Sequence, residues 1–143
     1  LLDGVDVSER LRAPDVTAAV SEVSAHPEVR ATLVDLQRAW VREHSGNAVV
    51  VGRDIGTVVF PEAPVKVFLI ADVAVRARRR AGDIDADGAD LDELSDQIAR
   101  RDFLDSSRAI SPLRAADDAV IIDTSEISAA EVVRRVLDLV GKV

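Results

Sequence analysis

The chain has 143 residues, of which 48% are hydrophobic and 31% are charged, and its formal net charge is -8. This composition is typical of one soluble globular domain that is large enough to bury a core. The acidic balance excludes a general nucleic-acid or membrane-surface binder, because such proteins need a basic surface. The absence of cysteine excludes disulfides and thiolate metal sites and favours a cytoplasmic location.

The first third of the chain has helical spacing. The stretch "SERLRAPDVTAAVSEVSAH", residues 8–26, is interrupted at Pro14 and predicts an irregular, mostly helical appendage. A regular helix is predicted from Pro27, a residue favoured at the first helical position, up to "HSGN" at 44–47. Its apolar face is formed by Val29, Leu33, Leu36, Trp40 and Val41.

Strands and helices alternate in the remainder. Three continuous apolar runs predict strands covered on both faces, at Ala48 to Val51, Val65 to Ile70 and Ala119 to Ile122. Helical spacing predicts helices at 73–81, 91–107 and 128–139. This alternation predicts an α/β fold in which helices flank a parallel sheet.

Two adjacent charges, Arg53 and Asp54, follow the first predicted strand. Ligands of open parallel sheets bind at the carboxyl ends of the strands, so this position favours a role in a ligand crevice. Mutual neutralisation of the two charges at a strand end is an equally good interpretation of the sequence alone.

Two further clusters contain arginine. In "IARRDFLDSSRAISPL", residues 98–113, the spacing of Arg101, Asp105 and Arg108 stacks them on one helical face. In "RARRR", residues 76–80, four cations lie within little more than one turn and repel one another unless a bound anion, salt or solvent screens them. A solvated ion-pair ladder and a solvated basic face remain the alternatives.

These segments carry a resemblance. "GRDIGTVVFPEAPVKVFLIA", followed by "RARRR", "RRDFLDSSRAISPL" and "DAVIID", resembles the C-terminal two-thirds of the bacterial cytidylate kinases. The resemblance implies the fold of a P-loop nucleoside monophosphate kinase and transfer of the ATP γ-phosphoryl group to CMP or dCMP. It further implies that residues 1–27 are the remainder of a CMP-binding insert, and that residues 28–143 form the core with a lid around 76–108.

The resemblance also implies roles for individual residues. The contacts to the cytosine edge are assigned to Ser21, Arg30 and Asp54. A carboxylate suits this edge because cytosine offers an amino donor where uracil has a carbonyl. Arg53 and Arg108 are placed on the CMP phosphate, and Arg101 and Asp105 at the ribose. Catalytic roles are thereby implied for Arg53 and Arg108, and, among the lid arginines that close over the ATP phosphates, for Arg79 and Arg80.

One family motif is absent from this sequence. No G-x-x-x-x-G-K-[ST] occurs, so the loop that would hold ATP and Mg²⁺ lies outside this chain. In the family, the strand before that loop lies between those predicted at 48–51 and 65–70. We expect the missing segment to have been lost or to be supplied by another chain; otherwise we expect a monomer. This chain alone is expected to bind CMP weakly without catalysing transfer, and a catalytically inactive nucleotide-binding or interaction module is the alternative.

A calcium loop is a weaker alternative. "DIDADG", residues 83–88, matches the start of such a loop. However, its twelfth position, which needs a bidentate glutamate, is Leu94. The sequence therefore favours an acidic lid tip, and no metal ligand is predicted.

Overall fold

The computed structural model describes residues 2–83 and 90–142, and at a few helical positions near the N-terminus, Ser21 among them, only the backbone. The chain divides into two compact units, residues 1–48 and 49–143, which are treated separately below. No helix among the described residues is long and apolar enough to cross a membrane.

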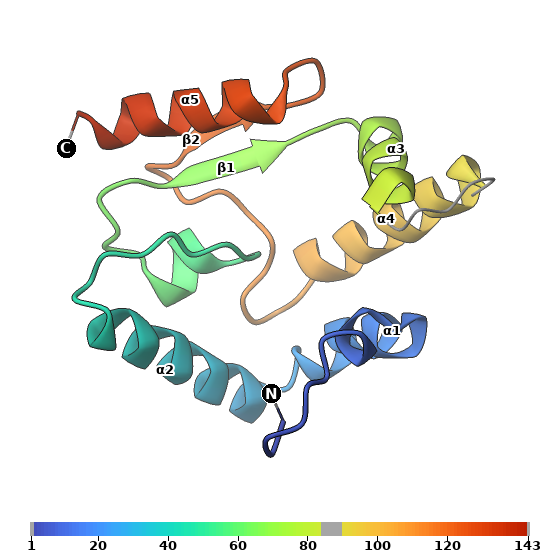
Figure 1. Cartoon of the computed structure of the whole chain (residues 1–143), viewed down its shortest axis with the longest axis horizontal. Coiled ribbons are helices and arrows are strands. Elements are labelled where there is room, and N and C mark those ends of the chain that lie inside the picture. Colours follow the sequence, from blue (N-terminus) through green and yellow to red (C-terminus); the bar gives the residue numbers. More distant parts are fainter. Residues whose placement is uncertain (1, 84–89, 143) are drawn as a thin grey trace. The chain divides into compact units, whose positions relative to one another are not determined.

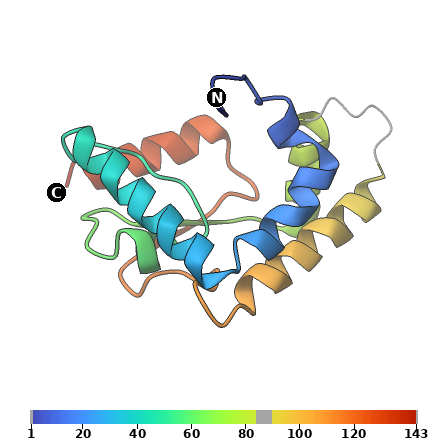
Figure 2. The same cartoon turned by 90° about the horizontal axis from the view of Figure 1, so that it is seen from below.

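The first unit is helical, as the sequence predicts. A 3-10 turn, η1 (Arg10–Arg12), precedes α1 (Pro14–Val23) and α2 (Pro27–Glu43), and a short turn joins the two helices (Figure 2). Both helices begin with proline, which lacks only an amide hydrogen that the helix does not need at that position. Gly46, at φ 77°, donates its amide to the Val41 carbonyl and ends α2.

The predicted apolar face of α2 is more exposed than expected. Val34 is buried, but Leu36 and Trp40 are 61% and 52% exposed. Trp40 instead stacks on His44, with ring centroids 4.0 Å apart, and the Trp40 carbonyl lies 2.7 Å from His44 Nδ1. Amphipathic spacing had indicated the right helix, but spacing alone does not show which residues will cover its apolar face.

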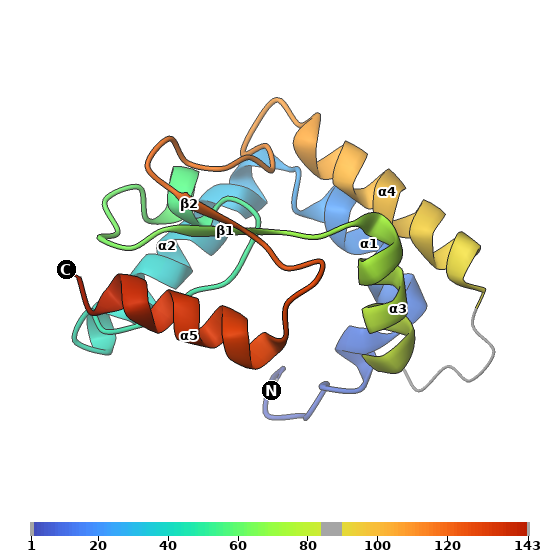
Figure 3. The same ribbon diagram turned by 90° about the horizontal axis from the view of Figure 1, so that it is seen from above.

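The second unit is built on two parallel strands, β1 (Val67–Ile70) and β2 (Val120–Asp123), paired from Val67 with Val120 to Ile70 with Asp123. Figure 1 shows β1 leading into α3 (Val73–Asp83), which packs against α4 (Leu91–Ser106). The last helix, α5 (Ala129–Val140), runs back along the strands (Figure 3). This arrangement confirms the predicted α/β class with a parallel sheet flanked by helices.

The strand predicted at Ala48 to Val51 is wrong, because this segment has no regular structure and Val49 and Val51 are 93% and 89% exposed. A strand exists only where another strand accepts its backbone hydrogen bonds, and in the described part of the chain β1 and β2 pair only with each other. The prediction that the strands are covered on both faces is also wrong for β1 and β2, because Leu69 and Ile121 are more than half exposed.

Several caps fix the helices and strands that carry the site. Asp90 accepts hydrogen bonds from the amides of Asp92 and Glu93 at the start of α4. At the amino ends of the strands, Lys66 Nζ lies 2.5 Å from a carboxylate oxygen of Asp118 and links the residues that precede β1 and β2. This hydrogen bond lowers the pKa of Asp118.

Candidate functional site

A tight turn positions Arg53 and Asp54. A Cβ added at Gly52 would lie 2.9 Å from the Ile55 side chain, so any larger residue here would have to displace that side chain. The Asp54 carbonyl then accepts the amides of three residues of a single π-helical turn, η2 (Ile55–Val59). As a result Asp54 is only 3% exposed, whereas the Arg53 side chain is 42% exposed.

Three arginines surround the carboxylate of Asp105, which is 2% exposed. Its Oδ1 lies 2.5 Å from Arg108 Nη2, and its Oδ2 lies 3.3 Å from Arg53 Nε and 3.9 Å from Arg101 Nε. The Asp105 carbonyl accepts the Leu113 amide at 2.8 Å, which folds the segment after α4 back toward this carboxylate. The structure therefore brings together four of the predicted site residues: Arg53, Arg101, Asp105 and Arg108.

The sequence analysis missed Asp102, and it had grouped Arg76 only with the lid arginines at 76–80. Asp102, on α4, lies with Oδ1 3.8 Å from Arg53 Nη1, and its Oδ2 accepts a hydrogen bond from Arg76 Nη1. Arg76 Nε also donates to the Ala71 carbonyl, just after β1, at 3.1 Å. The spacing of Asp102, three residues before Asp105, was a signal that could have revealed it.

These residues form what we term the arginine cluster, namely Arg53, Arg76, Arg101, Arg108, Asp102 and Asp105. Four arginines and two aspartates leave a formal excess of two positive charges in a chain whose net charge is -8. Such an excess, carried by forked guanidinium groups, is suited to bind a phosphate or carboxylate.

The remaining lid arginines lie elsewhere on α3. Arg79 donates to both the hydroxyl and the carbonyl oxygen of Thr124, and the Thr124 hydroxyl donates to the Ile70 carbonyl at 3.0 Å. Arg79 is thereby tied to the carboxyl ends of both strands although it is exposed, as Arg80 also is. Beside Thr124, hydrogen bonds from the Ser125 hydroxyl and amide hold the pKa of Asp123 below its usual value.

The first unit contributes two predicted residues, Ser21 on α1 and Arg30 on α2. The side chain of Ser21 is outside the described part of the structure, and Arg30 is partly exposed.

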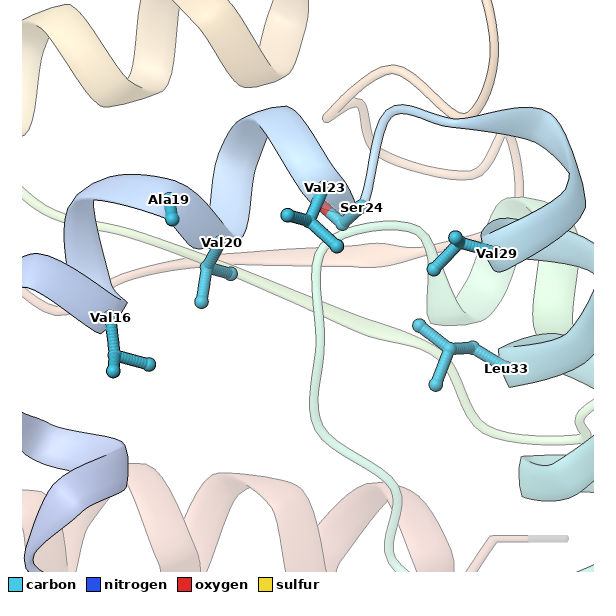
Figure 4. A pocket seen from close by; sticks show the side chains of 7 residues that line it. All are labelled: Val16, Ala19, Val20, Val23, Ser24, Val29 and Leu33. Atoms are coloured by element: carbon cyan, nitrogen blue, oxygen red, sulfur yellow. The ribbon is translucent and has the colours of Figure 1, made fainter.

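The same unit has an open apolar groove of about 310 Å³ between α1 and the first turns of α2 (Figure 4). The described residues that line it are Val16, Ala19, Val20, Val23, Ser24, Val29 and Leu33. None of these carries a charge, so they offer no counter-ion to a phosphate group.

The calcium interpretation cannot be followed in the structure, because residues 84–89 of the proposed loop lie outside the described residues. In residues 2–83 and 90–142, no group of three or more His, Asp and Glu side chains is placed to hold a metal ion.

The small parallel sheet with flanking helices places the chain in the α/β class, and the family match that follows assigns it to the P-loop nucleoside monophosphate kinases. A family model described as cytidylate kinase matches residues 1–142. The chain belongs to the cytidylate kinase family.

Curated relatives agree with this assignment. The chain is 54% identical over 141 residues to a cytidylate kinase of Mycobacterium leprae, with 97% of this chain and 63% of the relative covered. A cytidylate kinase of Carboxydothermus hydrogenoformans is 46% identical, with 99% and 64% covered. A bifunctional pantoate ligase/cytidylate kinase of Synechococcus is 50% identical, with 96% and 25% covered. The chain thus spans less than two thirds of the length of these relatives.

Proposed function

We propose that this chain forms the acceptor half of a cytidylate kinase, which transfers the γ-phosphoryl group of ATP to CMP or dCMP and yields CDP or dCDP. The observation that carries the proposal is the arginine cluster around buried Asp105, next to the turn that buries Asp54. This turn and α4 place a cationic group and a carboxylate close together, which is what a nucleoside monophosphate requires at its phosphate and its base.

The phosphate of CMP would lie against Arg53 and Arg108, whose guanidinium groups Asp105 already holds in place. Orientation before binding reduces the cost of fixing two long side chains when the ligand arrives. Asp105 and Arg101 would in addition reach the ribose, with the carboxylate accepting a hydroxyl hydrogen bond while it keeps its contacts to Arg53 and Arg108.

Asp54 would accept a hydrogen bond from the amino group of cytosine. Uracil has a carbonyl at this position, which would face the carboxylate without a shared hydrogen and leave a buried charge poorly solvated. Ser21 and Arg30 are proposed to contact the same base.

Phosphoryl transfer needs further parts. Arg79 and Arg80 are proposed to stabilise the charge that develops on the transferred group, which for Arg79 requires release from Thr124. ATP and Mg²⁺ would be held mainly by a phosphate-binding loop whose motif this sequence lacks. No described residue is assigned to Mg²⁺. A cytoplasmic location and small-molecule nucleotides as the only partners complete the proposal.

Thermal unfolding of the chain with CMP, dCMP, UMP or AMP tests the binding half of this proposal. A ligand at about a hundred times its dissociation constant stabilises the folded state by about 2.7 kcal/mol. We expect CMP and dCMP to raise the melting temperature more than UMP and AMP do. Asp54→Asn should abolish this preference, and Asp138→Asn, the same change on α5, should keep it. Equal effects of CMP and UMP on the parent chain would refute cytosine recognition.

A further inference from the structure

Asp102 links two arginines of the cluster that belong to different segments of the chain. Its two carboxylate oxygens face different arginines: Oδ1 lies 3.8 Å from Arg53 Nη1, and Oδ2 accepts from Arg76 Nη1. Arg53 belongs to the turn after residues 48–51, and Arg76 belongs to α3, so Asp102 connects these two segments to α4.

Both arginines have a second anchor. Arg53 is also held by Asp105, and Arg76 by the Ala71 carbonyl beyond β1. The contacts therefore form a continuous chain from Arg108 through Asp105, Arg53 and Asp102 to Arg76. Asp102 is the link whose loss would separate Arg76 from the rest of the cluster.

The geometry points to Asp102 as a positioning residue, which fixes the Arg53 guanidinium against α3 so that it binds the acceptor phosphate in the required orientation. This inference rests on the proposed function, because it takes the phosphate to be that of a nucleoside monophosphate. Asp102 itself is not required to touch the nucleotide.

A positioning role and simple electrostatics predict opposite effects of Asp102→Asn on anion affinity. The change raises the formal positive excess of the cluster from two charges to three, which by Coulomb attraction alone would strengthen anion binding. If Asp102 positions Arg53, the same change weakens anion binding, because the guanidinium no longer points where the phosphate needs it.

The experiment measures dissociation constants of inorganic phosphate and of CMP by calorimetry, using the complete gene product. We expect Asp102→Asn to weaken the binding of both ligands about tenfold, which corresponds to about 1.4 kcal/mol. Asp102→Glu, which keeps the carboxylate, should recover most of the affinity. Asp138→Asn, which makes the same change in net charge on the exposed face of α5, should leave both constants unchanged.

A second set of variants changes Arg76, the other partner of Asp102, so that the test does not depend on the folding of a single variant. Arg76→Gln should also weaken phosphate binding, because Asp102 then loses its contact with α3. Adding Asp102→Asn to Arg76→Gln should cost less than Asp102→Asn costs in the parent chain, since one of the two contacts that it breaks is already lost. Unchanged or tighter phosphate binding by Asp102→Asn, additive losses in the double variant, or a parent protein that binds no phosphate would each overturn the inference.

The phosphate titration, together with the comparison of CMP and UMP by thermal unfolding, separates this inference from the proposed function. If phosphate binding responds to Asp102→Asn as expected but CMP and UMP bind equally well, the positioning role stands and cytosine recognition fails.

Discussion

At the scale of single residues, the central feature is a nearly inaccessible carboxylate, Asp105, shared by three arginines. A buried charge of this kind is costly unless it is fully paired, and removal of one partner leaves the others without compensation. The side chain of Arg108 is only 12% exposed, so solvent cannot readily replace the carboxylate there. The ion pair between Asp105 and Arg108 therefore contributes to the stability of the second unit as well as to the proposed binding.

Asp105→Asn should accordingly destabilise the chain. Loss of the charge-assisted contact to Arg108 is expected to lower the free energy of unfolding by about 2 kcal/mol, as measured by urea denaturation. The matched exposed pair on α5, between Arg134 and Asp138, provides the control, because Asp138→Asn should change stability by less than about 0.5 kcal/mol. Equal losses in the two variants would contradict a special role for the buried pair.

The sequence was sufficient to predict part of this cluster. Helical spacing correctly put Arg101 and Asp105 together on α4, whereas Arg108, predicted on the same helical face, lies beyond the end of α4 at Ser106 and still contacts Asp105. The rule about strand ends singled out Arg53, although the strand predicted before it does not form. The contacts of Asp102 with Arg53 and Arg76 come from three separate segments. Such contacts depend on how α3 packs against α4, which spacing within a single helix does not show.

At the scale of elements, the first turn of α5 combines a serine cap with a group of ion pairs. The Ser128 hydroxyl accepts the Glu131 amide, and the Glu131 carboxylate accepts hydrogen bonds from Arg134 and Arg135. These bonds lower the pKa of Glu131 from 4.5 to about 2. The pKa of Glu131 is lower in the folded state than in the unfolded state. The ionised carboxylate therefore stabilises the folded state above about pH 4.5, and this stabilisation disappears as the pH falls toward 2.

Glu131→Gln should remove this pH dependence. Near pH 7 the variant should melt at a lower temperature than the parent chain, and the difference should shrink as the pH falls from about 4.5 toward 2. Melting curves of both proteins across this range provide the measurement. A difference that stays constant with pH would mean that the carboxylate contributes nothing through its charge.

The junction between α3 and the strand ends depends on Thr124, which is 6% exposed. Thr124→Val keeps the shape but removes the hydroxyl that accepts from Arg79 and donates to the Ile70 carbonyl. We expect a loss of about 1 kcal/mol in the free energy of unfolding, since Arg79 loses one of its two acceptors at Thr124 and the Ile70 carbonyl keeps only the hydrogen bond from the Thr124 amide. Thr124→Ser, which keeps the hydroxyl, should lose less stability in the same denaturation experiment. Equal free energies of unfolding for Thr124→Val and Thr124→Ser would contradict a role for the hydroxyl.

Most elements were predictable because local signals define them. The periodic spacing and the capping residues gave α2, α3, α4 and α5 to within a few residues of their observed ends. Residues 48–51 have the same apolar character as the strands but lack a hydrogen-bonding partner among the described residues, and no local signal reports that. The single turn η2 was missed because it is set by amides that converge on one carbonyl, that of Asp54.

At the scale of the whole molecule, the proposed activity depends on a motif that the 143 residues do not contain. We expect this chain alone to show no detectable conversion of CMP to CDP in a coupled kinase assay, because it lacks the loop that would hold ATP. The complete gene product should catalyse the conversion. Turnover by the chain alone would contradict the assignment of ATP binding to that loop, and a complete gene product that binds CMP without turnover would favour the inactive binding module.

The stacking of Trp40 on His44 has an optical consequence. The sequence contains one tryptophan and no tyrosine, so fluorescence excited selectively in tryptophan originates wholly from the first unit. Far-ultraviolet circular dichroism averages the helices of both units. When the two signals are followed through one denaturation, coincident curves mean that residues 1–48 and 49–143 unfold as a single cooperative body, and separated curves mean that each unit has its own stability. The native chain thus carries a site-specific reporter without any label.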